Sequence, residues 1–391
     1  MAAISKVVLW IMAIFAVLGV IDRIIKYWAP DWKVPVIDGF GAEMENGFNA
    51  MGALSLAMVG IIAMTPLLGK WLIPVVGPIY TALGSRTAMF AGTLLAIDMG
   101  ATPLGLQLAK AAGDPTWVGY FGGLMLGSVF GVNIVFNIPV GLGIIEARDR
   151  KYLALGILAG IIVAPFGALL ESVLAGNPFG ASLAYLVPVF IVAALIAAGL
   201  IFIRDAMVKG FIYFGKFITS FILFGLGLVI FQTQTGVTIL PGMAPTFSHY
   251  DPETGAVVME GLEVIGSIAL ALAGAYPMVK FLTKVLEKPL GALGKGLGMD
   301  SVGAAGLVAT IANNIPMWGM FKDMTPRGKV INAAWQVAAA FTFADHLGFT
   351  AANAKQFIGP LIIGKLFAGV LGIIVATFVA PKADYRDPEA A

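Results

Sequence analysis

Apolar residues dominate long stretches of this chain, and polar residues fall mainly between those stretches. A helix that crosses a bilayer needs about 20 mainly apolar residues. Nine stretches meet this requirement and are predicted to be full membrane spans: residues 6–27, 46–69, 116–138, 152–175, 180–203, 210–231, 258–281, 330–348 and 358–380. The pattern therefore predicts an all-α integral membrane protein.

Two pairs of shorter apolar stretches interrupt this series. One pair covers residues 84–97 and 100–112, and the other covers residues 299–312 and 315–321. Because each stretch is short for a full span, we predict two broken or re-entrant helical hairpins. If the hairpin segments cross the membrane instead, the total becomes about 10 or 11 spans.

The chain also contains an internal repeat. Residues 48–105 overlay residues 262–319 without a gap, at a constant separation of 214 positions. Six glycine pairs coincide in this overlay: Gly52/Gly266, Gly60/Gly274, Gly77/Gly291, Gly84/Gly298, Gly92/Gly306 and Gly105/Gly319. We predict a first transmembrane repeat, a connecting span, a second repeat and a cytoplasmic tail, at residues 1–175, 176–209, 210–380 and 381–391.

The repeat also predicts how its two copies are oriented across the membrane. An odd number of predicted crossings separates equivalent elements, so the two repeats face opposite ways across the membrane. Inverted repeats whose helices break at equivalent places are typical of secondary transporters. Lipid cannot satisfy free backbone groups, so a helix breaks at membrane depth only beside protein or a wet cavity.

Composition agrees with this class and excludes several others. The chain is 59% hydrophobic and only 12% charged, which a soluble domain of 391 residues does not reach. A formal net charge of +2 gives no basic face for nucleic acid, and the chain contains no cysteine. With two histidines and no catalytic signature, we expect no metal, no cofactor and no enzyme activity.

Charge bias predicts the orientation. Lys and Arg favour cytoplasmic loops, and the longest polar loop, residues 232–255, contains neither. This places the N-terminus outside and the C-terminus inside. The apolar run after Lys6 resembles a signal sequence but lacks a cleavage site, so we expect it to remain as the first span.

The centres of the two hairpins supply the main candidate site residues. Asp98 follows the first short apolar stretch, and Asn313 and Asn314 follow its counterpart in the second repeat. An ionised side chain at membrane depth usually faces a cavity and serves function, although Asp98 is also suited to capping the next helix. The two asparagines are suited to bind a hydroxyl or amine, or to satisfy the broken backbone.

Further candidates lie outside the hairpins. The overlay pairs Asn49 with Glu263, and Glu45 lies four residues before Asn49. Glu263 either points into the pathway or complements the helix dipole, which is also the simpler role for Glu45. Asp345 and His346 interrupt the apolar run of the eighth span. They are suited to relay a proton or hold an amine, or to form structural bonds to the backbone.

Several long motifs resemble a known family. MFAGTLLAIDMG at 89–100, EVIGS at 263–267, LVATIANNIPM at 307–317 and DHLGF at 345–349 are similar to those of the bacterial ethanolamine-utilisation membrane permeases, and the similarity covers nearly the whole chain. The resemblance implies a facilitator that moves ethanolamine across the bacterial cytoplasmic (inner) membrane. It also implies a homo-oligomer surrounded by membrane lipid.

The chemistry of the candidate residues fits such a substrate. Ethanolamine is mostly protonated near neutral pH, so Asp98, with Glu263, would offset desolvation of the ammonium, and Asn313 or Asn314 would hold the hydroxyl. The leaking free base becomes scarcer by about tenfold per pH unit below the amine pKa, so the protein should matter most in acidic medium. Two alternatives remain: an ion-coupled symporter using Asp345 and His346, and a membrane enzyme acting on amine-containing lipids.

Overall fold

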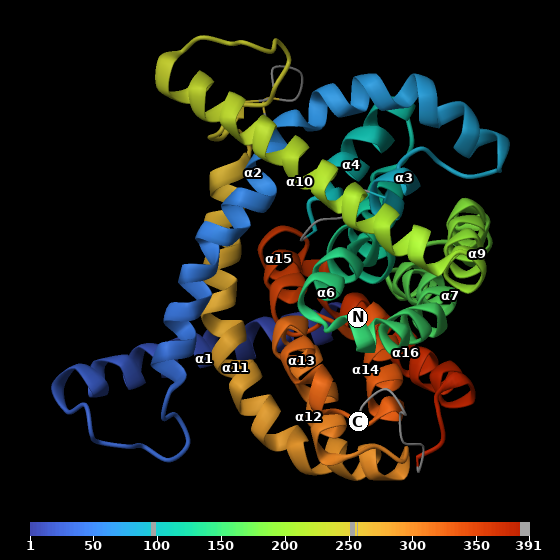
Figure 1. The fold of residues 1–391 in the computed structure, drawn as a ribbon. Helices are drawn as coiled ribbons and strands as arrows, with labels where there is room; N and C mark the ends of the chain where they lie inside the picture. Colours follow the sequence, from blue (N-terminus) through green and yellow to red (C-terminus); the bar gives the residue numbers. More distant parts are fainter. Residues whose placement is uncertain (95–98, 251–254, 256, 384–391) are drawn as a thin grey trace.

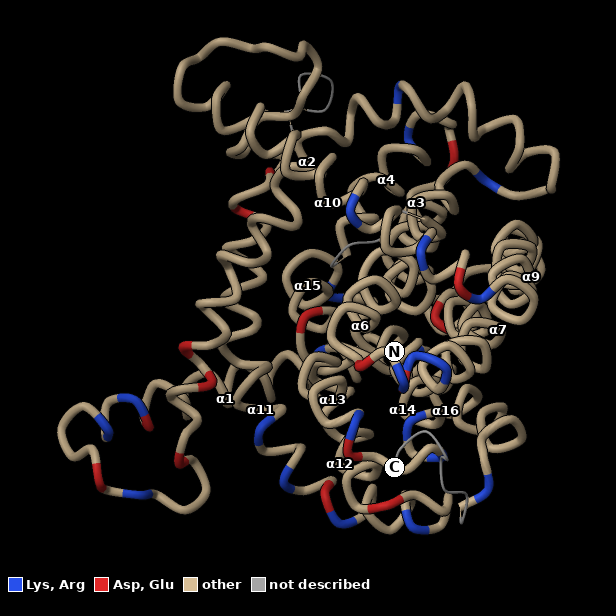
Figure 2. Tube along the Cα trace, viewed as in Figure 1, with Lys and Arg blue, Asp and Glu red and all other residues tan. Residues whose placement is uncertain are grey.

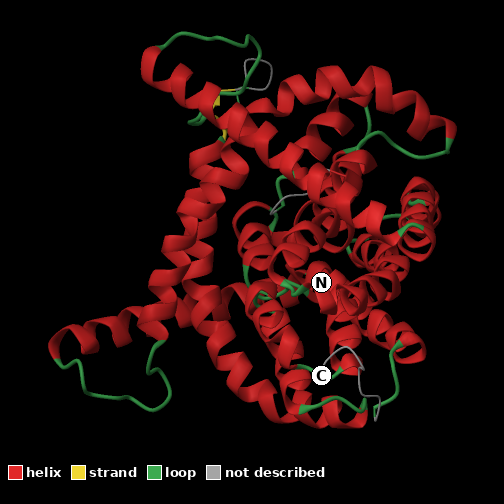
Figure 3. Cartoon of the chain, viewed as in Figure 1, coloured by secondary structure: helices red, strands yellow, loops and turns green. Residues whose placement is uncertain are grey.

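The computed structural model describes residues 1–94, 99–250, 255 and 257–383. Almost all of this part is helical (Figure 3). Its strands are β1 (His249–Tyr250) and β2 (Val257–Val258), which pair antiparallel in the loop before α11. The prediction of an all-α membrane protein is confirmed.

Long apolar helices account for most of the predicted spans. Seven segments are long and apolar enough to cross a membrane: α1 (Ala2–Trp28), α2 (Phe40–Ala82), Thr116–Ile144, η4 (Ala147–Asp149) with α7 (Arg150–Leu174), α10 (Arg204–Thr235), α11 (Gly261–Gly296), and η6 (Lys355–Phe357) with α16 (Ile358–Val379). An eighth span is formed if α8 (Phe179–Tyr185) and α9 (Val187–Phe202), which meet at a 43° bend, act together.

The predicted span at 330–348 is broken. It consists of α14 (Pro326–Ala339) and α15 (Asp345–Asn353), separated by five residues that include Phe341 at a φ of 61°. A positive φ is uncommon for a bulky residue, so this break is a specific feature of the backbone. Among the described residues, seven or eight of the nine predicted spans are long and apolar enough to cross a membrane, and this one is broken.

The two predicted hairpins are pairs of short helices. In the first repeat they are α3 (Met89–Leu94) and α4 (Ala101–Ala112). In the second they are α12 (Ser301–Thr310) and α13 (Asn314–Met320), followed by the 3-10 turn η5 (Phe321–Asp323). In the second repeat, the interruption at 311–313 falls where the overlay predicts it. In the first repeat, the described residues between α3 and α4 are Met99 and Gly100.

The third span is continuous but not a regular α-helix. It begins as α5 (Thr116–Tyr120), passes through three π-helical segments and ends as α6 (Ile138–Ile144). The π segments are η1 (Phe121–Met125), η2 (Gly127–Gly131) and η3 (Asn133–Asn137). Such segments are rare and are frequent at functional sites.

Helices α2 and α11, which the repeat makes equivalent, lie side by side along one edge of the molecule (Figure 1). A Cβ atom on Gly47 would lie 2.6 Å from the backbone at Ala273, and one on Gly261 would lie 3.3 Å from Val59. Residue numbers rise along one helix as they fall along the other, so the two helices run antiparallel. Glycine permits this close approach.

The first helix of each predicted repeat packs against the second helix of the other. In α2, a Cβ on Gly60 would overlap the carbonyl oxygen of Ile222 in α10. In α11, a Cβ on the matched Gly274 would overlap the carbonyl oxygen of Met12 in α1. The two equivalent glycines therefore make equivalent helix crossings, each with a helix of the other half.

Helices α7, α14 and α16 form a second packed group. Gly156 and Gly160 of α7 contact α14, and Gly167 contacts Gly364 and Ala368 of α16. Charged residues lie mostly in connections and at helix ends, as in the loop after α1 and around α12 (Figure 2). The predicted boundaries at 175 and 210 stay predictions.

Candidate functional site

Two helix breaks in the second repeat, one between α12 and α13 and one between α14 and α15, are joined by backbone hydrogen bonds. Phe341 N donates to Thr310 O at 3.3 Å, and Phe343 N donates to Ile311 O at 3.0 Å. The interruption between α14 and α15 thus lies against the interruption between α12 and α13. Each supplies partners for backbone groups that lipid would leave unpaired.

A chain of buried amides joins this crossing to the π-helical span. Asn314 Nδ2 donates to Asn137 Oδ1 at 2.8 Å, and Asn137 Nδ2 donates to Asn133 Oδ1 at 2.9 Å. Asn133 Nδ2 then donates to Val337 O of α14 at 2.8 Å. All three asparagines are fully buried, and Asn314 Oδ1 has no partner among the described residues.

Asn313 has a different position from its neighbour. Its Oδ1 accepts from Ile315 N at 2.8 Å and so caps α13. The residue also lines a cavity of about 530 Å³ together with Tyr276, Lys280 and Pro316. We call this space the second cavity. Of the two asparagines, Asn313 borders an open space and Asn314 lies within packed protein.

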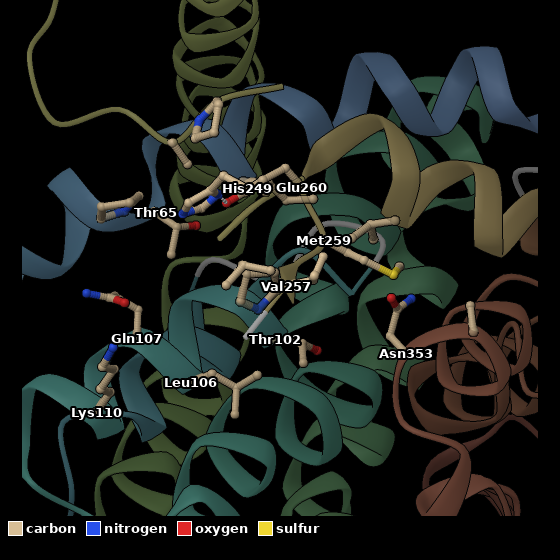
Figure 4. Close-up of a pocket in the computed structure, with 18 of the residues that line it drawn as sticks. Thr65, Thr102, Leu106, Gln107, Lys110, His249, Val257, Met259, Glu260 and Asn353 are labelled. Carbon is tan, nitrogen blue, oxygen red and sulfur yellow. Dashed lines mark ion pairs between the residues drawn. The ribbon is translucent and has the colours of Figure 1, made fainter. Parts of the chain in front are cut away.

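The other end of the α2–α11 pair borders a larger cavity of about 850 Å³, which we call the first cavity. Figure 4 shows Thr65 of α2, Thr102 and Gln107 of α4, and His249 and Glu260 of the loop region around it. Thr102 Oγ1 is buried and has no partner among the described residues.

The two cavities occupy equivalent places in the repeat. Four lining residues of the first cavity meet lining residues of the second at the separation of 214: Ile62/Tyr276, Thr65/Val279, Pro66/Lys280 and Thr102/Pro316. Since α2 and α11 run antiparallel, these equivalent cavities lie at opposite ends of the helix pair.

Helix α15 reaches from one cavity to the other. Ala344, directly before it, lines the second cavity, while Phe349, Ala352 and Asn353 line the first. Its 9 residues span about 13 Å. The two ends of this short helix therefore border different cavities.

The predicted acid–histidine pair lies at the start of α15. Asp345 Oδ1 accepts from Tyr276 OH at 3.0 Å, which ties it to a residue of the second cavity. His346 is fully buried against Phe341, with ring centroids 5.3 Å apart. Neither His346 nitrogen has a hydrogen-bond partner among the described residues. Asp98, the strongest sequence candidate, lies outside the described residues.

Glu263 and Glu260 organise the loop beside the first cavity. Glu263 accepts from Ser248 N at 2.8 Å and from Ser248 Oγ at 2.9 Å, and forms a capping box with Glu260 at the start of α11. Glu260 lies 3.3 Å from His249 Nδ1. Burial, together with the neighbouring Glu263 carboxylate, raises the pKa of Glu260 to about 7. Glu260 lines the first cavity, whereas Glu263 holds the adjacent loop through Ser248.

The remaining two candidates lie on α2, apart from both cavities. Glu45 forms an ion pair with Arg23 of α1 at 2.5 Å and is partly exposed. Asn49 is exposed. The structure brings neither of them together with Asn313, Asp345 or the first cavity.

Two buried charged residues were missed from the sequence. Lys365 of α16 and Glu171 of α7 are both fully buried, and both approach Ser128 in the π-helical span. The signal was present, since each is a lone charge within a long apolar run. A buried ion pair, Lys329 with Asp149 at 2.6 Å, joins α14 to the start of α7.

Comparison with known proteins gives a consistent family. The model of "Ethanolamine utilisation protein, EutH" matches residues 4–379. "Probable ethanolamine permease EutH" of Escherichia coli K12 is 47% identical, with 97% of each chain covered. The protein of the same name from Listeria monocytogenes is 48% identical, covering 97% of this chain and 95% of the relative.

A Bacillus subtilis relative, "Uncharacterized protein YxeR", is 42% identical over 94% of this chain and 95% of its own. No solved structure matches the chain. With a family match over nearly its full length and relatives this similar, the chain belongs to the EutH family of ethanolamine utilisation proteins.

Proposed function

We propose that this protein is a permease that carries ethanolamine across the bacterial inner membrane into the cell. Two of its relatives bear the name of ethanolamine permease, and its described part is a multi-pass bundle of apolar helices. The observation that carries the proposal is the pair of cavities at equivalent repeat positions and opposite ends of α2 and α11.

The two halves form an inverted repeat. Three observations support this relation: the antiparallel course of α2 and α11, the equivalent crossings of Gly60 and Gly274, and the matched linings of the cavities. In transporters of this kind, rocking of one part against the other exposes a central site alternately to each side. The two cavities are then the two access routes, and α15 is part of the wall between them.

The orientation follows from charge bias. The first cavity lies beside the loop that contains no Lys or Arg, and the second lies beside Lys280 on the α11 segment that also carries Lys284 and Lys288. With the N-terminus outside and the C-terminus inside, the first cavity faces the outside and the second faces the cytoplasm.

Substrate recognition divides between a charged and a neutral group. The ammonium of ethanolamine needs a carboxylate partner at membrane depth, a role we assign to Asp98, with Asp345 beside the second cavity. Its hydroxyl needs an amide or hydroxyl partner, for which Asn313, Tyr276 and Thr102 border the cavities. Asn314 and His346 contribute by holding the wall between them, and Glu263 by holding the outer loop.

A membrane-embedded enzyme has less support. The relatives from Escherichia coli and Listeria monocytogenes bear the name of a probable ethanolamine permease, not of an enzyme. Incubation of the purified protein with ethanolamine and with phosphatidylethanolamine should yield no product. Formation of a product would favour the enzyme.

Exposed apolar residues on α1, including Trp10 and Val17, provide a face for membrane lipid or for a second copy of the chain. The expected homo-oligomer remains a proposal. Cross-linking in native membranes, followed by mass measurement, tests it.

The transport proposal is tested by uptake of labelled ethanolamine into proteoliposomes at acidic pH. We expect saturable uptake by the wild type and a severe loss in Asp98→Asn. Asp31→Asn, a change in the exposed loop after α1, is the matched control and should behave as wild type. Unchanged saturable uptake in Asp98→Asn would remove Asp98 from the site, and absence of uptake by the wild type would refute the permease itself.

A further inference from the structure

Three helices place a charged pair and a hydroxyl together in the interior. Lys365 Nζ donates to Ser128 O at 2.6 Å. Ser128 Oγ donates to Met125 O at 2.8 Å and lies 3.4 Å from Glu171 Oε1, as a longer second contact. Ser128 belongs to η2, Glu171 to α7 and Lys365 to α16. Lys365 and Glu171 are both fully buried, and neither lines either cavity described above.

Glycines on the surrounding helices leave room for the Glu171 side chain. A Cβ on Gly364 would overlap Cγ of Glu171, and Gly167 lets α7 and α16 approach at the same crossing. Glycine at 364 thus provides the space that the Glu171 side chain fills. The arrangement is a site built by close helix packing, because a side chain at 364 would displace the carboxylate.

The charges of this site are only partly compensated. Glu171 Oε2 is buried and has no hydrogen-bond partner among the described residues. Removing a carboxylate and an ammonium from water costs several kcal/mol per ion. Ionisable residues kept inside a membrane usually mark ion pathways or proton relays.

Few other charges face Glu171. Helices α8 and α9 pack beside α7 and contain no charged residue. On α14, Lys329 is engaged with Asp149 at the opposite end of α7. The charge of Lys365 acts on Glu171 and also on His346 of α15. The site is therefore one carboxylate and one ammonium, with His346 as the next titratable neighbour.

From these contacts we infer that Glu171, Lys365 and Ser128 form a proton-binding site that couples ethanolamine transport to proton entry. The inference rests on the proposed permease function and replaces the expectation of an uncoupled facilitator. Protonation forms an O–H bond at Glu171 Oε2, and release to water breaks the same bond.

Protonation would act through the π-helical span. Ser128 of this span lies beside Glu171 and accepts from Lys365, so a change of charge at Glu171 alters the contacts that hold the span. The same span carries Asn133 and Asn137, whose amide chain reaches Asn314 at the crossing of the helix breaks. Proton binding thereby changes the contacts that hold the wall between the two cavities.

The test uses proteoliposomes whose exterior is one pH unit more acidic than the interior, with the voltage clamped at zero. Entry of ethanolammonium with one proton would concentrate labelled ethanolamine about tenfold inside. Uncoupled entry of the cation would give equal concentrations. Leakage of the free base would leave the interior about tenfold lower. The three mechanisms therefore give three different ratios.

We expect the wild type to approach the tenfold ratio, and Glu171→Gln to give a ratio of one while retaining counterflow exchange at equal pH. Glu287→Gln, an exposed change on α11, is the matched control and should keep the wild-type ratio. If Glu171→Gln does not fold, Ser128→Ala tests the same site and should give a ratio between one and ten.

A wild-type ratio of one would overturn the coupling while leaving the permease intact. A wild-type ratio retained in Glu171→Gln, or in Ser128→Ala when it serves as the substitute, would overturn the assignment to this site. Absence of saturable uptake and counterflow in the wild type would instead refute the permease function on which the inference rests.

Discussion

The first and second cavities occupy the same place in the two halves of the chain, yet they present different chemistry. Both lie between the long second helix of a repeat and its broken hairpin. The first includes Glu260 and His249 beside the loop before α11, whereas the second includes Asn313 and Tyr276. The repeat has kept the backbone arrangement and the helix crossings while the polar side chains have diverged.

Such divergence suits a substrate with unlike ends. Ethanolamine carries a charge at one end and a neutral hydroxyl at the other, so identical cavities would offer it redundant partners. Mutations at the equivalent helix crossings should affect both halves equally. Mutations of the polar side chains should affect one cavity at a time.

The largest effect is expected from the matched glycines of the two crossings. Gly60→Ala and Gly274→Ala would each place a Cβ on a backbone carbonyl of the neighbouring helix, at a cost of about 3 kcal/mol or more. We expect both variants to lose most folded protein in detergent, measured by size-exclusion chromatography and thermal denaturation.

Gly52→Ala and Gly266→Ala are the controls for this pair, because nothing lies within 4 Å of a Cβ at either position. They should fold as wild type. If Gly60→Ala were harmful and Gly274→Ala harmless, the two crossings would not be equivalent.

The opposite facing of the cavities can be measured directly, since the natural chain has no cysteine. Val258→Cys in the first cavity should react with a membrane-impermeant maleimide added outside right-side-out vesicles. Thr283→Cys in the second cavity should react only in inverted vesicles. Reaction of both from the same side would contradict the inverted arrangement.

The two asparagines of the second repeat should differ in cost. Asn314→Ala leaves Asn137 Oδ1 without its buried donor, which costs about 1–3 kcal/mol. Asn313→Ala removes a helix cap, at about 1 kcal/mol, but also changes a cavity wall.

Thermal denaturation should therefore show the larger loss for Asn314→Ala. At matched protein amount, uptake should show a direct loss for Asn313→Ala. The exposed Asn46→Ala is a suitable control. The reverse order of stabilities would place Asn313 in the more important structural bond.

The smallest effect concerns pH and the loop beside the first cavity. Burial and Glu263 raise the pKa of Glu260 from an ordinary 4.5 to about 7. The folded state therefore binds this proton more tightly than the unfolded chain, so the stability it contributes is present below pH 4.5 and is lost as pH rises toward 7.

Hydrogen exchange at β1 and β2, corrected for its intrinsic pH dependence, should show tighter protection at pH 5.5 than at pH 8. Glu260→Gln should remove most of that difference. An unchanged difference in Glu260→Gln would assign the effect to another group, with His249 the nearest titratable neighbour.

Much of the architecture was predictable because it depends on local pattern. Apolar length predicted most of the spans, and the overlay matched Gly60 with Gly274, which the fold shows at equivalent helix crossings. The interruption before Asn314 followed from polar residues and proline within an apolar segment. The π-helical course of the third span was not predictable, because a change in hydrogen-bond spacing has no sequence signature comparable to a cap or a proline.

The site was less predictable, since its contacts join distant residues. Asn314 and Asn137 are 177 positions apart, and only the fold reveals that they bond. Glu171 and Lys365 could have been singled out as isolated charges, but their shared contact with Ser128 depends on three helices meeting. The involvement of Asp98 remains a sequence-based prediction.

The crossing of Gly60 with α10 also has a consequence for biogenesis. When the ribosome has completed the first half, the groove around Gly60 still lacks the helix that fills it, because Ile222 has not been synthesised. In the same way, α1 lacks its packing partner until Gly274 of α11 has been synthesised. Neither half can complete its own packing, so the folding of the protein in the membrane is a late event that requires both halves. A truncated first half would expose an unpacked helix surface that quality-control proteases can recognise.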